Sequence, residues 1–185
     1  VNLMQGAAQL SEKDRHVDAS LFYALTMTTE EIVAFYTERK KQLQAELTQY
    51  EQVIALQGRV MPKRRLDILK EKTNTIAMKL TSAKGHLKLA EDTPSFTTTL
   101  RWKKADNFQL TKRDFESFWG FYWLFKDFPE NEMAENFLYA AFASSNSVKE
   151  REKSIELGEE YLANDKWTKF RADVTFIMAN AYRQE

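Results

Sequence analysis

The chain has 185 residues, of which 43% are hydrophobic and 29% charged, with 27 acidic side chains, 27 basic side chains and no cysteine. The hydrophobic content excludes general disorder, and the balanced charge excludes a global basic field that would attract nucleic acid or membranes. The lack of cysteine excludes disulfides, cysteine-ligated zinc and thiol catalysis. With only 5 Gly and 3 Pro, the composition disfavours a β-rich fold and predicts an all-α protein.

Residues 1–27 predict a pair of short helices. The first is expected from Asn2 to Leu10. Ser11 is the expected N-cap of the second, because its hydroxyl can accept a backbone N–H and because Glu12 and Asp14 follow in the first turn. The pair is a candidate for a partial helical repeat.

Residues 28–92 predict an antiparallel coiled-coil hairpin. Thr28 or Thr29 is the expected N-cap of the first arm, and Gly58 and Pro62 lie at the turn, where glycine can end a helix in a left-handed cap and proline cannot continue one. Apolar residues in each arm recur on alternating three- and four-residue steps, which is a heptad seam. The arms have roughly 28 residues each, or about 42 Å. The seam positions are Ile32, Tyr36, Leu43, Leu47, Tyr50 and Ile54, then Leu66, Leu69, Thr73, Ile76, Leu80, Ala83, Leu87 and Ala90.

Basic residues gather at the expected tip of this hairpin. They are Arg59, Lys63, Arg64, Arg65 and Lys70, against the single acid Asp67. Three of them fall in the first turn of a helix, where the helix dipole disfavours each cation by roughly 0.3–1 kcal/mol. Two interpretations stay open: the tip contacts an anionic surface (an acidic protein, lipid headgroups or nucleic-acid phosphate), or it is an ordinary solvated turn.

Residues 93–112 predict an extended connector after the helix stop at Thr93–Pro94. Phe96, Thr98, Leu100 and Trp102 alternate with polar residues, which is the period of a strand. A solitary strand cannot satisfy its own backbone, so this segment is expected to lie as a packed loop. Pairing with another segment and an edge for a partner strand are the alternatives.

Residues 113–185 predict further helices, beginning with one whose aromatic side chains surround it from Phe115 to Phe128. Such a helix is expected to be sandwiched between neighbours or covered by a partner, and Gly120 is a place where another backbone can approach. Core packing is the favoured role of these aromatics. The alternative is a docking surface that includes Trp119, Tyr122 and Trp123. The following helices are expected at about 131–145, 148–163 and 168–184.

A shift of 38 residues aligns Ala134–Glu135 with Ala172–Asp173 and Leu138–Tyr139 with Phe176–Ile177, as expected of a helical solenoid. The segment Met178-Ala179-Asn180-Ala181-Tyr182 resembles the first helix of a tetratricopeptide repeat, and Ser117 to Pro129 resembles its second helix through the terminal proline. Asp127-Phe128-Pro129 is similar to repeats of bacterial envelope proteins of this class. The resemblance implies a curved scaffold without chemistry of its own, whose concave face binds peptides or proteins, with Tyr139 and Asn180 as candidate contacts.

No catalytic pattern accompanies these helices: the sequence has no phosphate-binding glycine loop, nucleophile elbow or HExxH motif, and neither His16 nor His86 follows a Glu by three residues. We therefore expect no enzyme, no cofactor and no metal site. The expected function is a protein–protein interaction scaffold or adaptor that binds a protein or peptide. The alternatives are a coiled-coil oligomerisation module and contact with an anionic lipid or nucleic-acid surface, of which nucleic acid is disfavoured. The unpaired last helix predicts a segment of a longer solenoid, in either the periplasm or the cytoplasm.

Overall fold

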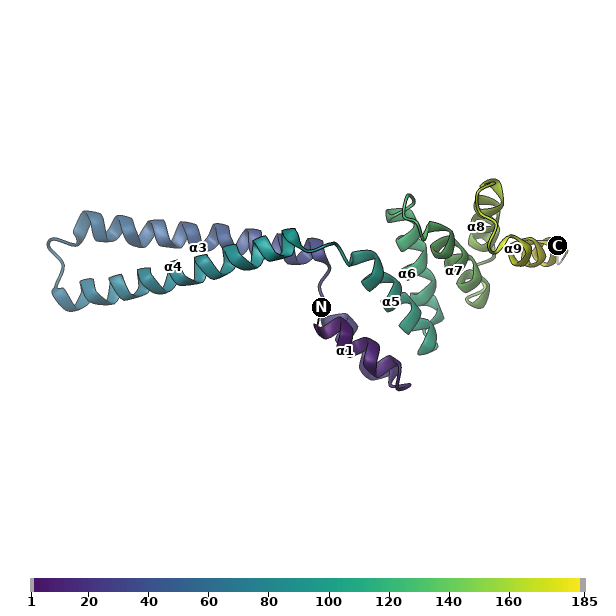
Figure 1. Cartoon of the computed structure of the whole chain (residues 1–185), viewed down its shortest axis with the longest axis horizontal. Helices are drawn as coiled ribbons and strands as arrows, with labels where there is room; N and C mark the ends of the chain where they lie inside the picture. The colour runs from purple at the N-terminus through teal and green to yellow at the C-terminus, as the bar shows by residue number, and fades with distance from the viewer. Residues whose placement is uncertain (1, 184–185) are drawn as a thin grey trace. The chain divides into compact units, whose positions relative to one another are not determined.

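The computed structural model describes residues 2–183, and within this range the chain is all-helical and has no strand. It divides into two compact units. One unit, called here the helical body, combines the residues up to Thr26 with those from Thr97 onward. The other, called here the hairpin, is Met27–Phe96 and contains the two longest helices (Figure 1). The expected all-α class is confirmed.

The hairpin consists of α3 (Thr29–Gln57) and α4 (Lys63–Asp92), which lie side by side (Figure 1). Thr28 is the N-cap of α3: the Glu31 N–H donates to Thr28 Oγ1 at 3.2 Å, and the Thr28 N–H donates to Glu31 Oε2 at 2.7 Å. This reciprocal pair is a capping box, and it satisfies N–H groups that a helix start leaves unpaired. Phe96 is the last residue of the hairpin, and its N–H donates to Thr29 Oγ1 at 3.2 Å. This bond joins the start and the end of the hairpin segment.

A single apolar seam runs between α3 and α4. Leu43, Ile76, Leu80 and Ala83 are buried in one cluster, and Tyr36, Leu47 and Tyr50 pack against it. All seven are positions of the stripe read from the sequence. Because each arm has only one such stripe, neither helix has another apolar face to bury within the hairpin, and the pairing of the arms is the main source of their stability.

The turn between the arms differs from the expected one. Gly58 has φ −57° and ψ −30°, which is right-handed helical, and its N–H donates to the Ile54 carbonyl oxygen at 2.8 Å. The expected left-handed cap is therefore wrong. Glycine serves a different purpose here, because a Cβ at this position would lie 2.4 Å from that same carbonyl oxygen. Pro62 is the N-cap of α4, as its fixed φ and missing N–H allow.

The helical body contains α1 (Asn2–Ser11), α2 (His16–Leu25), α5 (Thr97–Leu110), α6 (Asp114–Asp127), α7 (Ala134–Ser147), α8 (Arg151–Ala163) and α9 (Arg171–Arg183). Each helix packs on the next one in this order, including α2 on α5. Asn107 joins that pair, since its Nδ2 donates to the His16 carbonyl oxygen at 3.1 Å and to Ser20 Oγ at 2.6 Å. The hairpin is thus inserted in the sequence between two helices that pack directly on each other.

Two expectations for the body are wrong. Ser11 ends α1 and does not cap α2, which starts five residues later at His16. The extended connector expected over 93–112 is instead largely α5, whose buried residues are Thr97, Leu100, Ala105 and Asn107. The three threonines at 97–99 lower helix propensity and imitate a strand pattern. Packing against α2 and α6 outweighs that local preference. Within 93–112, the short segment before Thr97 and the turn at residues 111–112 are non-helical.

Three helix pairs of the body share one turn. The residue in the turn has a positive φ in each: 57° at Asp14, 61° at Lys112 and 61° at Lys149. The next N–H then donates to the carbonyl five residues earlier, as in a Schellman motif. These bonds are Arg15 to Leu10 (2.9 Å), Arg113 to Phe108 (2.9 Å) and Glu150 to Ser145 (3.0 Å). L-residues rarely adopt positive φ, so the three turns share an uncommon backbone geometry.

Buried positions also recur when the three pairs are aligned on this turn. The first helix of each pair buries the residue seven before the turn. The residues five, nine and twelve after the turn are also buried, and all of them lie in the second helix except Thr26, which is the C-cap of α2. The corresponding sets are Ala7, Ala19, Tyr23 and Thr26; Ala105, Ser117, Phe121 and Leu124; and Phe142, Ser154, Gly158 and Tyr161. The pairs α1/α2, α5/α6 and α7/α8 therefore have the same internal packing register.

The turns at Lys112 and Lys149 lie 37 residues apart, one residue less than the shift that aligned the sequence. A shift of 37 places Phe137 on Val174, and both are fully buried. The 38-residue shift maximised chemical similarity but pairs the fully buried Leu138 with Phe176, which is 69% exposed. Helix packing, and not residue type, determines which positions are equivalent.

Tyr161 connects α8 to α7 and to the segment before α9. Its hydroxyl donates to Glu135 Oε1 and accepts the Phe170 N–H at 2.9 Å, while the same carboxylate accepts the Lys169 N–H at 2.8 Å. Burial, followed by the hydrogen bond to Glu135, raises the pKa of Tyr161 from 10.0 to about 12. The neutral phenol is thus the form that the folded body prefers.

A pH titration of stability should detect this phenol. Its contribution is complete below pH 10, where Tyr161 is neutral in both states, and is lost as the pH rises through about 12. Between about pH 9 and 11.5, the free energy of unfolding should fall by about 2 kcal/mol more in the wild type than in Tyr161→Phe. Urea unfolding followed by circular dichroism, repeated at each pH, gives the free energy of unfolding of both proteins. If this free energy falls with pH equally in the wild type and in Tyr161→Phe, then Tyr161 does not have the raised pKa.

Candidate interaction surfaces

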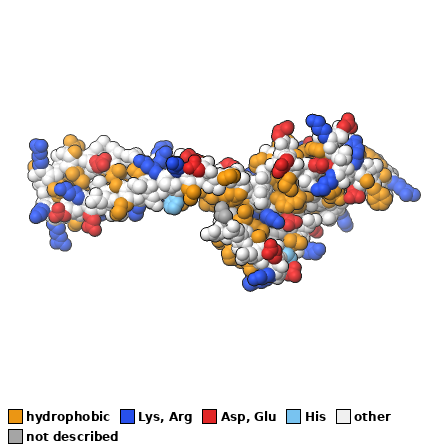
Figure 2. All heavy atoms as spheres, viewed as in Figure 1, with side chains coloured by type: hydrophobic (Ala, Val, Ile, Leu, Met, Phe, Trp, Pro, Cys, Tyr) orange, Lys and Arg blue, Asp and Glu red, His pale blue; other side chains and the backbone are white. Residues whose placement is uncertain are grey.

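The first candidate surface is the hairpin tip, formed by the end of α3, the turn and the start of α4. The predicted basic residues Arg59, Lys63, Arg64, Arg65 and Lys70 are all exposed there, and basic groups mark this end of the hairpin in Figure 2. Within the described residues, no ion pair or hydrogen bond engages these five side chains. Their charge is therefore compensated only by solvent and ions.

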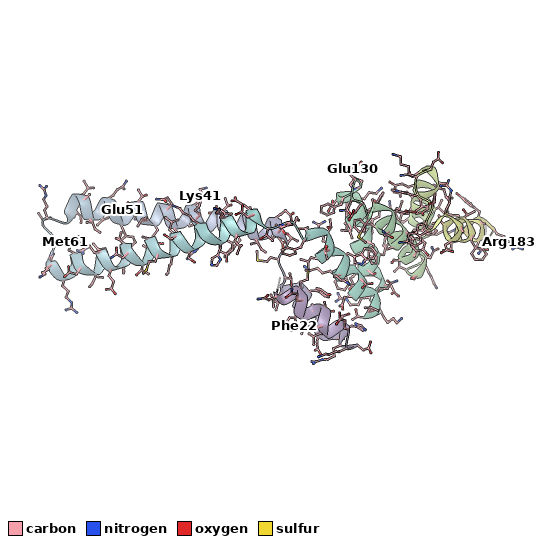
Figure 3. The ribbon with its side chains drawn as sticks, viewed as in Figure 1. Phe22, Lys41, Glu51, Met61, Glu130 and Arg183 are labelled. Atoms are coloured by element: carbon pink, nitrogen blue, oxygen red, sulfur yellow. The ribbon has the colours of Figure 1, made fainter. Side chains whose placement is uncertain are left out.

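The same tip exposes large apolar side chains, which the sequence reasoning missed. Leu56 is 83% exposed and Val60 86%, the two highest values among the large apolar residues described. Met61, labelled at the tip in Figure 3, is half-buried. Their exposure could have been predicted from the sequence, because Leu56 and Val60 lie next to the turn and are not positions of the heptad seam. The tip thus combines cations with uncovered hydrocarbon.

The second candidate surface lies on α6. This helix buries Phe118, Phe121 and Phe125 but exposes 55% of Phe115 and 55% of Trp123, and it leaves Trp119 and Tyr122 half-buried. The expectation that neighbouring helices of the body enclose the whole circumference is therefore wrong, whereas cover by a partner stays a prediction. Packing against α5 and α7 uses only one side of the helix, and the helical period places residues 115, 119, 122 and 123 together on the other.

These four side chains, called here the aromatic stripe, form a continuous ring cluster. The Trp119 and Trp123 rings stack with centroids 6.2 Å apart and planes 25° apart. The Tyr122 ring meets both edge-on, at 5.3 Å from Trp119 and 5.2 Å from Trp123. Phe115 extends the cluster by one helical turn, 6.3 Å from Trp119. Mutual packing holds the rings in place while their outer surfaces stay accessible.

Two lysines border the aromatic stripe. The Nζ atoms of Lys126 and Lys153 lie 5.7 and 5.5 Å from the Tyr122 ring centroid, within cation–π range. Glu160 accepts from Lys126 at 2.9 Å and Glu156 accepts from Lys153 at 2.6 Å. The hydrogen bond to Glu156 raises the pKa of Lys153. The surface therefore offers aromatic rings with charged groups of both signs at one edge.

Close packing of α6 on α5 explains how the aromatic stripe is presented. A Cβ at Gly120 would lie 2.9 Å from Ala105 Cβ and 3.4 Å from its Cα. Another backbone was expected to approach at Gly120, and the helix that does so is α5. Since both helices have small residues at the contact, α6 packs close to α5 and its large rings point away from that interface.

The other two predicted contacts lie elsewhere in the body. Tyr139 stacks on Phe170 with ring centroids 3.9 Å apart and planes 5° apart, and its hydroxyl is 3.4 Å from Asp173. Burial and the Asp173 charge raise the pKa of Tyr139. The ring thus secures α7 to the start of α9. Asn180 is exposed and lines a groove of about 370 Å³ with Ser145, Asn146, Lys149, Arg151, Ser154, Ile177 and Ala181.

Metal-ligand geometry and membrane-spanning character are both lacking in the described residues. Between positions 2 and 183, no group of three or more His, Asp or Glu side chains is arranged to hold a metal ion. Among the helices of the same range, none has the length and apolar content that crossing a bilayer requires.

Comparison of the chain with family models, with curated proteins and with solved structures gives no match.

Proposed function

We propose that the chain is a non-enzymatic interaction scaffold, built from helical repeats similar to tetratricopeptide repeats and carrying a coiled-coil hairpin between two of them. The observation that supports this most strongly is the shared turn and buried register of α1/α2, α5/α6 and α7/α8. Stacked helix pairs touch only their neighbours and expose long ordered surfaces, which is how repeat proteins bind partners.

The aromatic stripe is the proposed docking site. Trp and Tyr dominate the binding energy of many protein interfaces because they bury a large area and lose few rotatable bonds. Trp119, Tyr122 and Trp123 have these properties and are already held by one another. Lys126 and Lys153 at one edge favour a peptide or protein segment that combines apolar side chains with a carboxylate.

Selection from a random peptide display library tests the proposal, because it does not require the natural partner to be identified first. We expect the 185-residue chain to select peptides that bind Trp119→Ser/Trp123→Ser about tenfold or more weakly, since loss of a hot-spot aromatic costs about 2 kcal/mol. Phe176→Ser is the matched control, because Phe176 is an exposed aromatic of α9 outside the stripe.

Selected peptides should keep their affinity for Phe176→Ser. Peptides that bind the double variant and the wild type equally would locate the site elsewhere on the scaffold. Circular dichroism of each variant checks that it is folded. Since Trp123 is 55% exposed and Trp119 half-buried, substitution at these positions should leave the helices intact.

A further inference from the structure

The hairpin tip carries a second binding chemistry that the scaffold proposal does not use. We infer that it is a docking site for an anionic phospholipid surface, where the basic side chains contact headgroup phosphates while Leu56 and Val60 enter the interfacial layer. The inference rests on the hairpin alone and is independent of the aromatic stripe.

The charge at the tip is local and uncompensated. Arg59, Lys63, Arg64, Arg65 and Lys70 are exposed, no ion pair within positions 2–183 engages them, and Asp67 is the only acid among residues 58–70. The chain as a whole is neutral, so this concentration is not part of a general basic field. Lys63, Arg64 and Arg65 occupy the first turn of α4, where the helix dipole favours acids over bases. An anionic ligand would offset that penalty.

The apolar side chains distinguish between the anionic ligands. Nucleic-acid phosphates would satisfy the cations but would leave Leu56 and Val60 in water. The interface of an anionic bilayer satisfies both groups, because it attracts Lys and Arg to headgroups and takes apolar side chains into the boundary with the acyl chains. Their exposure of 83% and 86% shows that the hairpin itself offers them no cover.

The form of the hairpin suits end-on contact. The two arms have 29 and 30 helical residues, which correspond to about 44 Å of paired rod. The Leu43, Ile76, Leu80 and Ala83 cluster keeps the arms together, so the turn is presented as the compact end of a stiff element. Basic and apolar side chains at that end can therefore meet a surface at the same time.

Vesicle co-sedimentation of the full chain tests the charge requirement. We expect binding to phosphatidylcholine vesicles that contain roughly 30% phosphatidylglycerol, little binding to pure phosphatidylcholine, and weaker binding when salt rises from about 50 to 500 mM. Arg64→Glu/Arg65→Glu should weaken partitioning about tenfold or more. Acids in the first turn of a helix are stabilising, so this variant should remain folded.

The matched control is Arg39→Glu/Lys41→Glu, which makes the same change in net charge at exposed positions in the first half of α3. The inference holds if this control binds like the wild type. Equal losses in the two variants would overturn it, because the effect would then come from total charge. Tighter binding to a short nucleic-acid duplex than to the anionic vesicles would also overturn it.

Insertion of the apolar side chains has its own test. The chain has no cysteine, so Val60→Cys carries a single environment-sensitive fluorophore, and Ala45→Cys, exposed midway along α3, is the control. Anionic vesicles should raise and blue-shift the emission at position 60 and leave position 45 unchanged. Leu56→Ser/Val60→Ser should also weaken binding about tenfold. If anionic vesicles leave the emission of the fluorophore at position 60 unchanged, the inference is overturned.

Discussion

Gly158→Phe is expected to destabilise the helical body by about 3 kcal/mol or more, since severe overpacking exceeds the ordinary range. Even a Cβ at this position would lie 2.3 Å from Met178 Sδ and 3.0 Å from Phe142 Cε2. A phenyl ring would need space that α7 and α9 already fill. Because both neighbours are buried side chains of those helices, they have little free volume into which to move.

The repeat register predicts how to reverse this loss. Shifted by 37 residues, Phe142, Gly158 and Met178 correspond to Ala105, Phe121 and Ala141. At these positions the pair α5/α6 thus has its aromatic ring on the second helix and alanines at the other two positions, whereas the pair α7/α8 has its ring on the first helix. Both sets are buried. The variant Phe142→Ala/Gly158→Phe/Met178→Ala should therefore recover most of the stability that Gly158→Phe loses.

Urea unfolding monitored by far-ultraviolet circular dichroism compares the wild type, Gly158→Phe and the triple variant. Phe142→Ala/Met178→Ala is the control, since it opens a cavity without inserting the ring and should cost about 5 kcal/mol or more. If the triple variant is less stable than this control, then the two helix pairs do not share a packing register. The structural basis of the repeat assignment would then be lost.

Leu80→Asp is expected to separate the arms of the hairpin while the body stays folded. Leu80 is 5% exposed in the seam with Leu43, Ile76 and Ala83, and a carboxylate there would have no partner. The cost is about 3–5 kcal/mol. Because α3 and α4 share a single seam, no other apolar cluster would hold them together once the seam is lost. Isolated helices in water have at best marginal stability.

Met78→Asp is the matched control, because Met78 lies two residues away in α4 and is 67% exposed. Amide hydrogen exchange by mass spectrometry resolves the two units separately. Leu80→Asp should lose protection across α3 and α4 but retain it in α6, α7 and α8, whereas Met78→Asp should match the wild type. Loss of protection in both units with Leu80→Asp would mean that they fold as one cooperative block.

The sequence alone predicts the elements whose signal is periodic and local. The heptad stripe indicated the seam residues Leu43, Ile76 and Leu80, because burial of one narrow face requires that spacing. The Thr28 cap and the helices after residue 131 were found for similar reasons. The basic tip was also evident, since unpaired charges beside a turn can be read directly from the chain.

Contacts between segments far apart in the sequence were decided only by the tertiary structure. The residues of α5 have weak helical periodicity and a run of threonines, so their helix depends on packing against α2, which lies before the hairpin in the sequence. The exposure of the aromatic stripe depends likewise on where α5 and α7 pack around α6.

The sequence by itself determined that this protein is helical, that residues 28–92 form two matched arms and that the tip is basic, because periodicity and charge are properties of neighbouring residues. Tertiary structure decided the 37-residue register, the role of Gly58 and which aromatics face solvent. The physical reason is that burial depends on which helices meet. In the body, Phe142 and Gly158 exchange the roles that Ala105 and Phe121 have, so residue type alone cannot identify equivalent positions.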